Sequence, residues 1–277
     1  MNEQVADFRA EADELARLLV TLGDDDWRLP TQFKDWTIND VVLHLHASDL
    51  MAIASTDGDE AFHAHLGEIR ARRRNGASLI EEARGRFPGL VGAAMFDRWR
   101  RGVDTLCERL DRLDSDARLP WVAMPMGLRM FTTARQMETW AHGLSIYDVL
   151  GLERIDTDRI KSIAVIGVRT FGFTFANRKL PVPAEVPHVR LTAPSGAIWE
   201  WNAPKPDADG KEPPAASSSV IGSAVDFCHV VTQVRHHADT GLRIDGDTAR
   251  QWMSMAQCFA GPPQDPPPGS RYRVVKT

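Results

Sequence analysis

Apolar residues recur at steps of three and four through the first two-thirds of the chain, which is the pattern of amphipathic helices. They predict a helix over residues 4–22, ended by Gly23 and the acidic run at 24–26, with Val5, Phe8, Ala12, Leu15, Leu18 and Leu19 on its apolar face. A second helix is predicted to begin after Thr37 and to run to about residue 55. Thr37 is a preferred N-cap residue, and Asp40, three residues later, completes an acidic variant of the capping box.

More helical segments follow before residue 151. Residues 60–86 are charged and predict a partly exposed helix that Pro88 and Gly89 terminate. A helix over 92–112 has an apolar face formed by Met95, Trp99, Val103, Leu106 and Leu110. After a loop at 119–127, which contains two prolines and a glycine, a helix over about 130–150 ends near Gly151. Four long helices joined by loops predict a helical bundle.

The pattern changes after about residue 180, where repeated prolines exclude a helix. Strands are predicted at 188–193 and 198–202, joined by a turn into a hairpin. Residues 203–219 predict an exposed loop, and helices at 222–233 and 247–259 flank a strand at 242–245. Residues 156–176 predict the first helix of this part or a connecting helix. We therefore predict the α+β fold class, with a helical bundle over 1–154 and a small α+β domain over 155–277.

The composition is that of a globular protein, with 43% hydrophobic and 26% charged residues among 277. The net charge of −5 argues against nucleic acid as a partner, because nucleic-acid binding needs a basic face. No apolar run approaches the ~18 residues that span a bilayer, and the first residues lack the features of a signal peptide. We expect a cytoplasmic protein without a membrane partner, either a monomer or a homodimer. Its three widely spaced cysteines favour buried free thiols.

One pair of residues in the last bundle helix has the chemistry of metal ligands. Glu138 and His142 are four residues apart, so both side chains share one helix face, with their Cβ atoms about 5–6 Å apart. His44, in the second helix, is the natural third ligand. Two imidazoles and one carboxylate suit a divalent ion, with zinc the first choice and nickel, iron, cobalt and manganese also compatible. Three protein ligands leave coordination positions open, which is typical of catalytic sites.

The same residues also have plain structural interpretations. Glu and His four residues apart often form a surface ion pair, and a single histidine on an apolar face is often a core residue. Asp40 is expected to cap its helix, with a contact to a metal-bound histidine as the alternative. Trp36 and Trp140 are expected to pack around the metal or to be ordinary core aromatics.

Two segments carry a family resemblance, Trp36-Thr37-Ile38-Asn39-Asp40-Val41-Val42-Leu43-His44-Leu45 and Met137-Glu138-Thr139-Trp140-Ala141-His142-Gly143. They resemble the DinB-like superfamily, and more closely the branch named for mycothiol-dependent maleylpyruvate isomerase. Further resemblance to one bacterial subfamily of this branch covers segments at 169–175, 191–196, 226–233, 239–242 and 256–263.

The resemblance implies a metal-binding four-helix bundle joined to a smaller C-terminal α/β domain of the sterol-carrier-protein type. The family's His, Glu, His metal triad maps onto His44, Glu138 and His142. One departure is His46, where relatives often have a small residue. Because residues two apart on a helix point about 200° apart, His44 and His46 are not expected to bind one ion together, and His46 stays as the alternative ligand.

The resemblance also implies an enzyme. In the named isomerase a low-molecular-weight thiol adds to an unsaturated dicarboxylate, the double bond rotates and the thiol leaves. We therefore expect isomerisation or thiol transfer on a small unsaturated carbonyl or carboxylate substrate, with an external thiol as cosubstrate. Arg235 is the candidate catalytic cation, on a C-terminal domain that the family likeness implies closes over the site; pairing with Asp226 or Asp239 is its structural alternative. Two other functions stay open: a hydrolase or lyase that uses metal-bound water, and a metal-bearing binding module without turnover.

Overall fold

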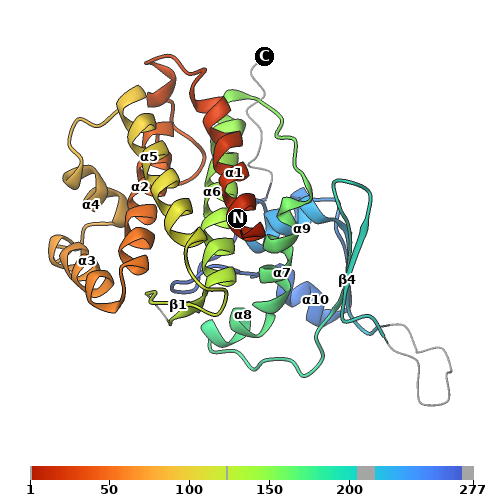
Figure 1. The fold of residues 1–277 in the computed structure, drawn as a ribbon. Helices are drawn as coiled ribbons and strands as arrows, with labels where there is room; N and C mark the ends of the chain where they lie inside the picture. The colour runs from red at the N-terminus through yellow and green to blue at the C-terminus, as the bar shows by residue number, and fades with distance from the viewer. Residues whose placement is uncertain (1, 123, 205–215, 270–277) are drawn as a thin grey trace. The chain divides into compact units, whose positions relative to one another are not determined.

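The computed structural model describes residues 2–122, 124–204 and 216–269 (Figure 1). The chain forms two compact units, one ending at Glu153 and the other beginning at Arg154. The predicted α+β fold class is confirmed, since the first unit is almost entirely helical and the second combines helices with a four-stranded sheet. No helix among the described residues is long and apolar enough to cross a membrane.

Four long helices build the first unit: α1 (Glu3–Leu19), α2 (Ile38–Thr56), α5 (Ala93–Asp111) and α6 (Leu128–Leu150). Helices α1 and α2 each pack against both α5 and α6, which closes a four-helix bundle (Figure 1). Its core is the set of apolar positions that the helical periodicity selects, including Phe8, Leu15, Val41, Trp99 and Leu106, all buried. The bundle is therefore the direct product of amphipathic faces meeting one another.

The ends of the long helices follow from local chemistry. At the start of α2 the N–H of Asp40 donates to Thr37 Oγ1 at 3.1 Å and the N–H of Thr37 donates to Asp40 Oδ2 at 2.9 Å, which confirms the predicted capping box. Helix α6 ends at Gly151, whose φ of 67° is a left-handed conformation that glycine adopts without strain. The start of α2 and the end of α6, the two helices that carry the candidate ligands, are thus fixed by local sequence.

The segment between α2 and α5 differs from its prediction as one helix. It forms α3 (Asp59–Arg72) and α4 (Leu79–Arg86), separated by a turn in which Gly76 has a φ of 80°. A second capping box starts α4, because Ser78 and Glu81 exchange hydrogen bonds between side chain and backbone. The remaining elements of this unit are the short η1 (Asp26–Arg28) and the strands β1 (Arg118–Leu119) and β2 (Met126–Gly127). These two strands pair antiparallel at the two ends of the segment predicted as a loop over 119–127.

The second unit begins with η2 (Asp158–Ile160), α7 (Lys161–Arg169) and α8 (Phe171–Asn177). Its sheet has the order β4-β3-β5-β6, and consists of β3 (His188–Thr192), β4 (Ile198–Trp201), β5 (Ser219–Ser223) and β6 (Arg243–Asp245). The predicted hairpin is confirmed by the antiparallel pairing of β3 with β4. Strand β3 buries Val189 and Leu191 on the face that α9 (Ala224–Val231) contacts and exposes Arg190 on the other.

Three predictions for the second unit need correction. Strand β5 was predicted as the end of a loop and the start of a helix, because its serine-rich sequence has no clear alternation of polar and apolar residues. The strand forms because it pairs with β3 on one side and β6 on the other. The single helix predicted at 156–176 is broken, with Thr170 between α7 and α8. The last helix, α10 (Asp247–Met253), is shorter than predicted; it follows η3 (His237–Asp239) and β6. Residues 205–215 of the predicted loop lie outside the described residues.

Candidate metal site

Three potential ligands converge between α2 and α6. Nε2 of His44 lies 3.5 Å from Oε2 of Glu138, and Nε2 of His142 lies 3.2 Å from the same oxygen. The donor atoms of all three residues lie within 4.8 Å of one another. Among residues 2–122, 124–204 and 216–269, this is the one group of three or more histidine, cysteine or acidic side chains with such a geometry.

The helices explain why these residues meet. Glu138 and His142 are one turn apart on α6, so both side chains leave the same face of that helix. His44 leaves α2 toward α6, whereas His46, two residues later, points to another side. The side chains of His44, Glu138 and His142 are mostly buried but keep 17%, 25% and 14% of their surface exposed, so none of the three is sealed from solvent.

The protonation states of this cluster suit a cation. Burial, aided by the nearby His142, lowers the pKa of His44 to about 4, against an opposing effect of Glu138, so His44 is a neutral imidazole near pH 7. Burial alone would raise the pKa of Glu138, but hydrogen bonds from His142 and His44 hold that pKa well below its ordinary value. A neutral imidazole beside an ionised carboxylate is the donor set that a divalent metal requires.

Aromatic rings cover the two histidines. The ring of Phe33 meets the ring of His142 edge-on with centroids 4.8 Å apart, and the indole of Trp36 lies 5.2 Å from the ring of His44. The contact of Trp36 with the histidines agrees with one of its two predicted roles. Trp140 is fully buried. The sequence did not predict a role for Phe33. Its ring reaches His142 because the chain turns before α2, and nothing in the local sequence indicates that turn.

His46 has a different environment from His44. It is 2% exposed, its Nε2 accepts a hydrogen bond from Nε of Arg98 at 3.2 Å, and its ring packs 5.3 Å from that of Phe87. Gly102 of α5 packs closely against the His46 ring, because a Cβ added to Gly102 would lie 3.3 Å from Nδ1 of His46. The structure therefore brings together His44, Glu138 and His142 and leaves His46 outside this group.

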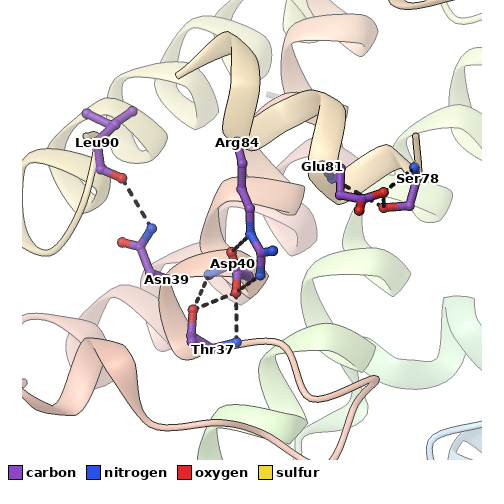
Figure 2. A network of polar contacts seen from close by, with 7 residues as sticks. All are labelled: Thr37, Asn39, Asp40, Ser78, Glu81, Arg84 and Leu90. Atoms are coloured by element: carbon purple, nitrogen blue, oxygen red, sulfur yellow. Dashed lines mark hydrogen bonds and ion pairs between the residues drawn. The ribbon is translucent and has the colours of Figure 1, made fainter. Parts of the chain in front are cut away.

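Asp40 is engaged at the start of α2. Figure 2 shows its carboxylate between Thr37 and Arg84, whose Nε and Nη2 donate to Oδ1 and Oδ2 at 2.8 and 2.7 Å. Burial raises the pKa of Asp40, but the hydrogen bonds from Arg84 and Thr37 outweigh burial and lower it. A cleft of about 630 Å³ lies beside this network, lined by Thr37, Asp40 and Arg84 among others, and none of the three candidate ligands lines it. Asp40 acts as a cap and ion-pair partner.

Arg235, the candidate cation, belongs to the second unit. It follows α9, its Nη1 donates to the carbonyl oxygen of Val234 at 2.9 Å, and its backbone N–H donates to that of His229 at 3.2 Å. The carboxylate of Asp226 accepts from the N–H of Gly241 at 3.0 Å.

A family model described as the mycothiol maleylpyruvate isomerase N-terminal domain matches residues 8–147, which include all three candidate ligands. The chain belongs to this family. Two curated proteins of Mycobacterium tuberculosis, from strains CDC 1551 / Oshkosh and ATCC 25618 / H37Rv, are each 38% identical over 259 residues, covering 94% of this chain and 96% of theirs. Both are described only as uncharacterized proteins.

Solved structures extend the family's fold to both units. The crystal structure of a mycothiol-dependent maleylpyruvate isomerase aligns with a TM-score of 0.53 at 12% identity, covering 87% of this chain and 91% of that one. A histidine-to-alanine variant of such an isomerase aligns with a TM-score of 0.51 at 11% identity, covering 82% and 87%. At this identity the likeness shows the fold of this family member.

Proposed function

We propose that this protein binds a divalent metal ion through His44, Glu138 and His142, with zinc the first choice and nickel, iron, cobalt or manganese as alternatives. The observation that carries the proposal is the convergence of their donor atoms within 4.8 Å, from two different helices. Two nitrogens and one carboxylate oxygen suit a borderline divalent ion. Three protein ligands leave room for a substrate or cosubstrate at the ion.

We further propose that the protein is an enzyme that uses an external thiol to isomerise, or to transfer the thiol to, a small unsaturated carbonyl or carboxylate compound. Membership of a family named for a mycothiol-dependent isomerase supports this reaction class. A divalent ion bound here would hold a thiol as its thiolate or polarise a carbonyl group. In the isomerisation, the thiolate adds to the double bond, the resulting single bond rotates, and elimination of the same thiol restores the double bond in the other geometry.

The protein's own residues have separate tasks in this proposal. His44, Glu138 and His142 bind the ion, and the rings of Phe33 and Trp36 fix the imidazoles and exclude water from one side. All three cysteines are buried, which is why the thiol is proposed to come from outside. Arg235 is proposed to bind a carboxylate of the substrate, because guanidinium offers a two-pronged donor for that group.

The first experiment measures the metal. The protein is purified without a metal-chelating tag and its metal content is determined by elemental analysis, with His44→Ala, His142→Ala and, as a matched control, the exposed His63→Ala. We expect about one equivalent of metal in the native chain and in His63→Ala, and loss of metal in the other two. A native protein that stays empty after incubation with zinc, nickel and iron would contradict the site.

The second experiment measures the reaction. Maleylpyruvate and other small unsaturated acids are offered to the metal-loaded protein with mycothiol, with other low-molecular-weight thiols and with none. Turnover that requires a thiol supports the proposal, whereas turnover without a thiol would favour a hydrolase or lyase that uses metal-bound water. Arg235→Gln is expected to raise KM for a carboxylate substrate while leaving metal content unchanged. Binding of metal without turnover of any substrate would favour a binding module.

A further inference from the structure

A second polar contact joins the two helices that carry the metal ligands. Nε and Nη2 of Arg135, on α6, lie 3.2 and 3.1 Å from Oδ1 of Asp49, on α2. The two side chains are only 4% and 1% exposed. This is a buried ion pair between α2 and α6, the same two helices that carry the three candidate ligands.

The ion pair lies close to the candidate ligands along both helices. Asp49 follows His44 by five residues on α2, and Arg135 precedes Glu138 by three on α6, which corresponds to about 7.5 and 4.5 Å along the respective helix axes. His44 contacts Glu138, whereas Asp49, later in α2, contacts Arg135, which comes earlier in α6. The helices are therefore antiparallel here, and the ligands and the ion pair are successive links between them.

Stability alone does not explain such a pair. Removing two charges from water is costly, and apolar side chains of similar volume often stabilise a core as well or better. The best-attested use of a buried polar contact is to fix the register of one helix against another. Register matters at this seam, since a slip of one residue would move a side chain about 1.5 Å and turn it by 100°, which is enough to separate donor atoms that now lie within 4.8 Å.

We propose that Asp49 and Arg135 are positioning residues that fix the register of α2 against α6 and thereby hold His44 against Glu138 and His142. The functional role of this ion pair rests on the proposed metal site, but its effect on helix register is also expected in the metal-free protein. There the rings of His44 and His142, whose centroids are 4.5 Å apart, should stay together only while the ion pair is intact.

The test replaces both charges together, because removal of one would leave the other buried without its partner. The variant Asp49→Leu/Arg135→Met keeps the approximate volume of the seam. Its matched control is Gln4→Leu/Gln136→Leu, which removes the buried 2.7 Å hydrogen bond between α1 and α6 and leaves α2 untouched. Arg135→Lys, which keeps the charge, is the conservative variant.

Three quantities are measured on folded protein. One is the dissociation constant for zinc, from competition with a chromophoric chelator; one is the visible absorption spectrum with cobalt(II), which reports ligand geometry. The third is the nuclear Overhauser effect between ring protons of His44 and His142 without metal. We expect the double variant to bind zinc about 10- to 100-fold more weakly, the range typical of lost supporting contacts around metal ligands, and to lose the cobalt spectrum and the Overhauser effect. Arg135→Lys should restore most of each, and the glutamine control should match the native chain.

An unchanged zinc constant and Overhauser effect in the folded double variant would overturn the inference, as would equal losses in the glutamine control. If native protein binds no zinc, the proposed function fails, and the Overhauser effect in the metal-free variants decides this inference separately. If the double variant does not fold, Asp49→Glu is compared with the native chain instead. This variant keeps the charge, but its side chain is longer by one methylene. It is expected to weaken the Overhauser effect, and an unchanged effect would count against the proposal.

Discussion

The indole ring of Trp36 lies nearly parallel to the imidazole of His142, with ring centroids 6.1 Å apart and an interplanar angle of 12°. The turn that carries Trp36 is unusual, because Lys34 and Asp35 both have a φ of 55°, in the left-handed region. Such conformations cost about 1–3 kcal/mol in residues other than glycine and persist where the surroundings hold them. Here a hydrogen bond of 2.7 Å from the N–H of Thr31 to the carbonyl of Trp36 closes the turn.

We predict that Trp36→Ala weakens zinc binding about 2- to 10-fold, since aromatic contacts contribute about 0.5–1.5 kcal/mol beyond burial. Trp36→Phe should retain most of the affinity. The measurement is zinc competition on folded protein. Trp121→Ala is the control, because Trp121 packs on Phe62 and Phe131 rather than on the histidines. Equal effects of the two alanine variants would show that the contact with His142 has no special role.

Asp40→Asn should destabilise the bundle without affecting metal content. It weakens the capping box at the start of α2 and the ion pair with Arg84, for which we expect a loss of about 1–2 kcal/mol in the free energy of unfolding at pH 7. Because the folded-state pKa of Asp40 lies below its ordinary value of 3.8, its contribution is present above that pH and is lost as the pH falls through the folded pKa.

Urea unfolding of the native chain and Asp40→Asn from pH 8 to pH 3 tests this sign. The difference in unfolding free energy should be constant down to about pH 5 and should shrink below about pH 4. Glu81→Gln, which alters the exposed capping box of α4, is the control and should have a smaller effect. Loss of metal in Asp40→Asn would instead indicate a direct role in supporting the ligands.

Much of this architecture could be read from the sequence because the signals are local. The periodicity of Phe8 and Leu15 gives α1, the Thr37–Asp40 pair marks the start of α2, and Gly151 marks the end of α6. The ExxxH spacing of Glu138 and His142 places both on one helix face. None of these depends on knowing where a distant segment lies.

What the sequence did not reveal depends on pairing at long range. Strand β5 is defined by neighbours on both sides, β3 and β6, rather than by its own alternation. Phe33 and His142 are in contact although more than 100 residues separate them in the sequence, and Asp49 and Arg135 are separated by 86 residues. The signal that could have suggested the last pair is a charged residue of opposite sign among the buried positions of each helix, because a buried charge is expected to have a partner.

The cysteines should be unreactive in the folded protein. Burial raises the pKa of Cys107 to about 12 and raises the pKa of Cys228 well above its ordinary value, and Cys258 is also buried. Since the thiolate is the reactive form, iodoacetamide at pH 8 should label none of the three in native protein and all three in denaturant. Mass spectrometry measures the labelling. Rapid labelling of a single native cysteine would reopen the question of an internal thiol in the reaction.

Gly167→Ala should destabilise the second unit. A Cβ at this position of α7 would lie 2.8 Å from Val231 Cγ2 and 2.9 Å from Phe227 Cε1, both on α9. Overpacking of this kind costs about 1–3 kcal/mol, more than alanine gains over glycine in a helix. Gly172→Ala in α8 is the control, because its Cβ would have only an ordinary contact at 3.7 Å with Val182. Thermal unfolding should show a lower Tm for Gly167→Ala alone.

Metal binding should stabilise the folded chain in proportion to its affinity. A ligand at 100 times its dissociation constant adds about 2.7 kcal/mol to the free energy of unfolding, provided that it binds only the folded state. We therefore expect zinc to raise the Tm of the native protein and a chelator to lower it to the metal-free value. His142→Ala should show neither response, whereas the exposed His63→Ala should show both. A zinc response that persists in His142→Ala would place the ion elsewhere, because two ligands from different helices, His44 and Glu138, retain little affinity once the one-turn pair on α6 is broken.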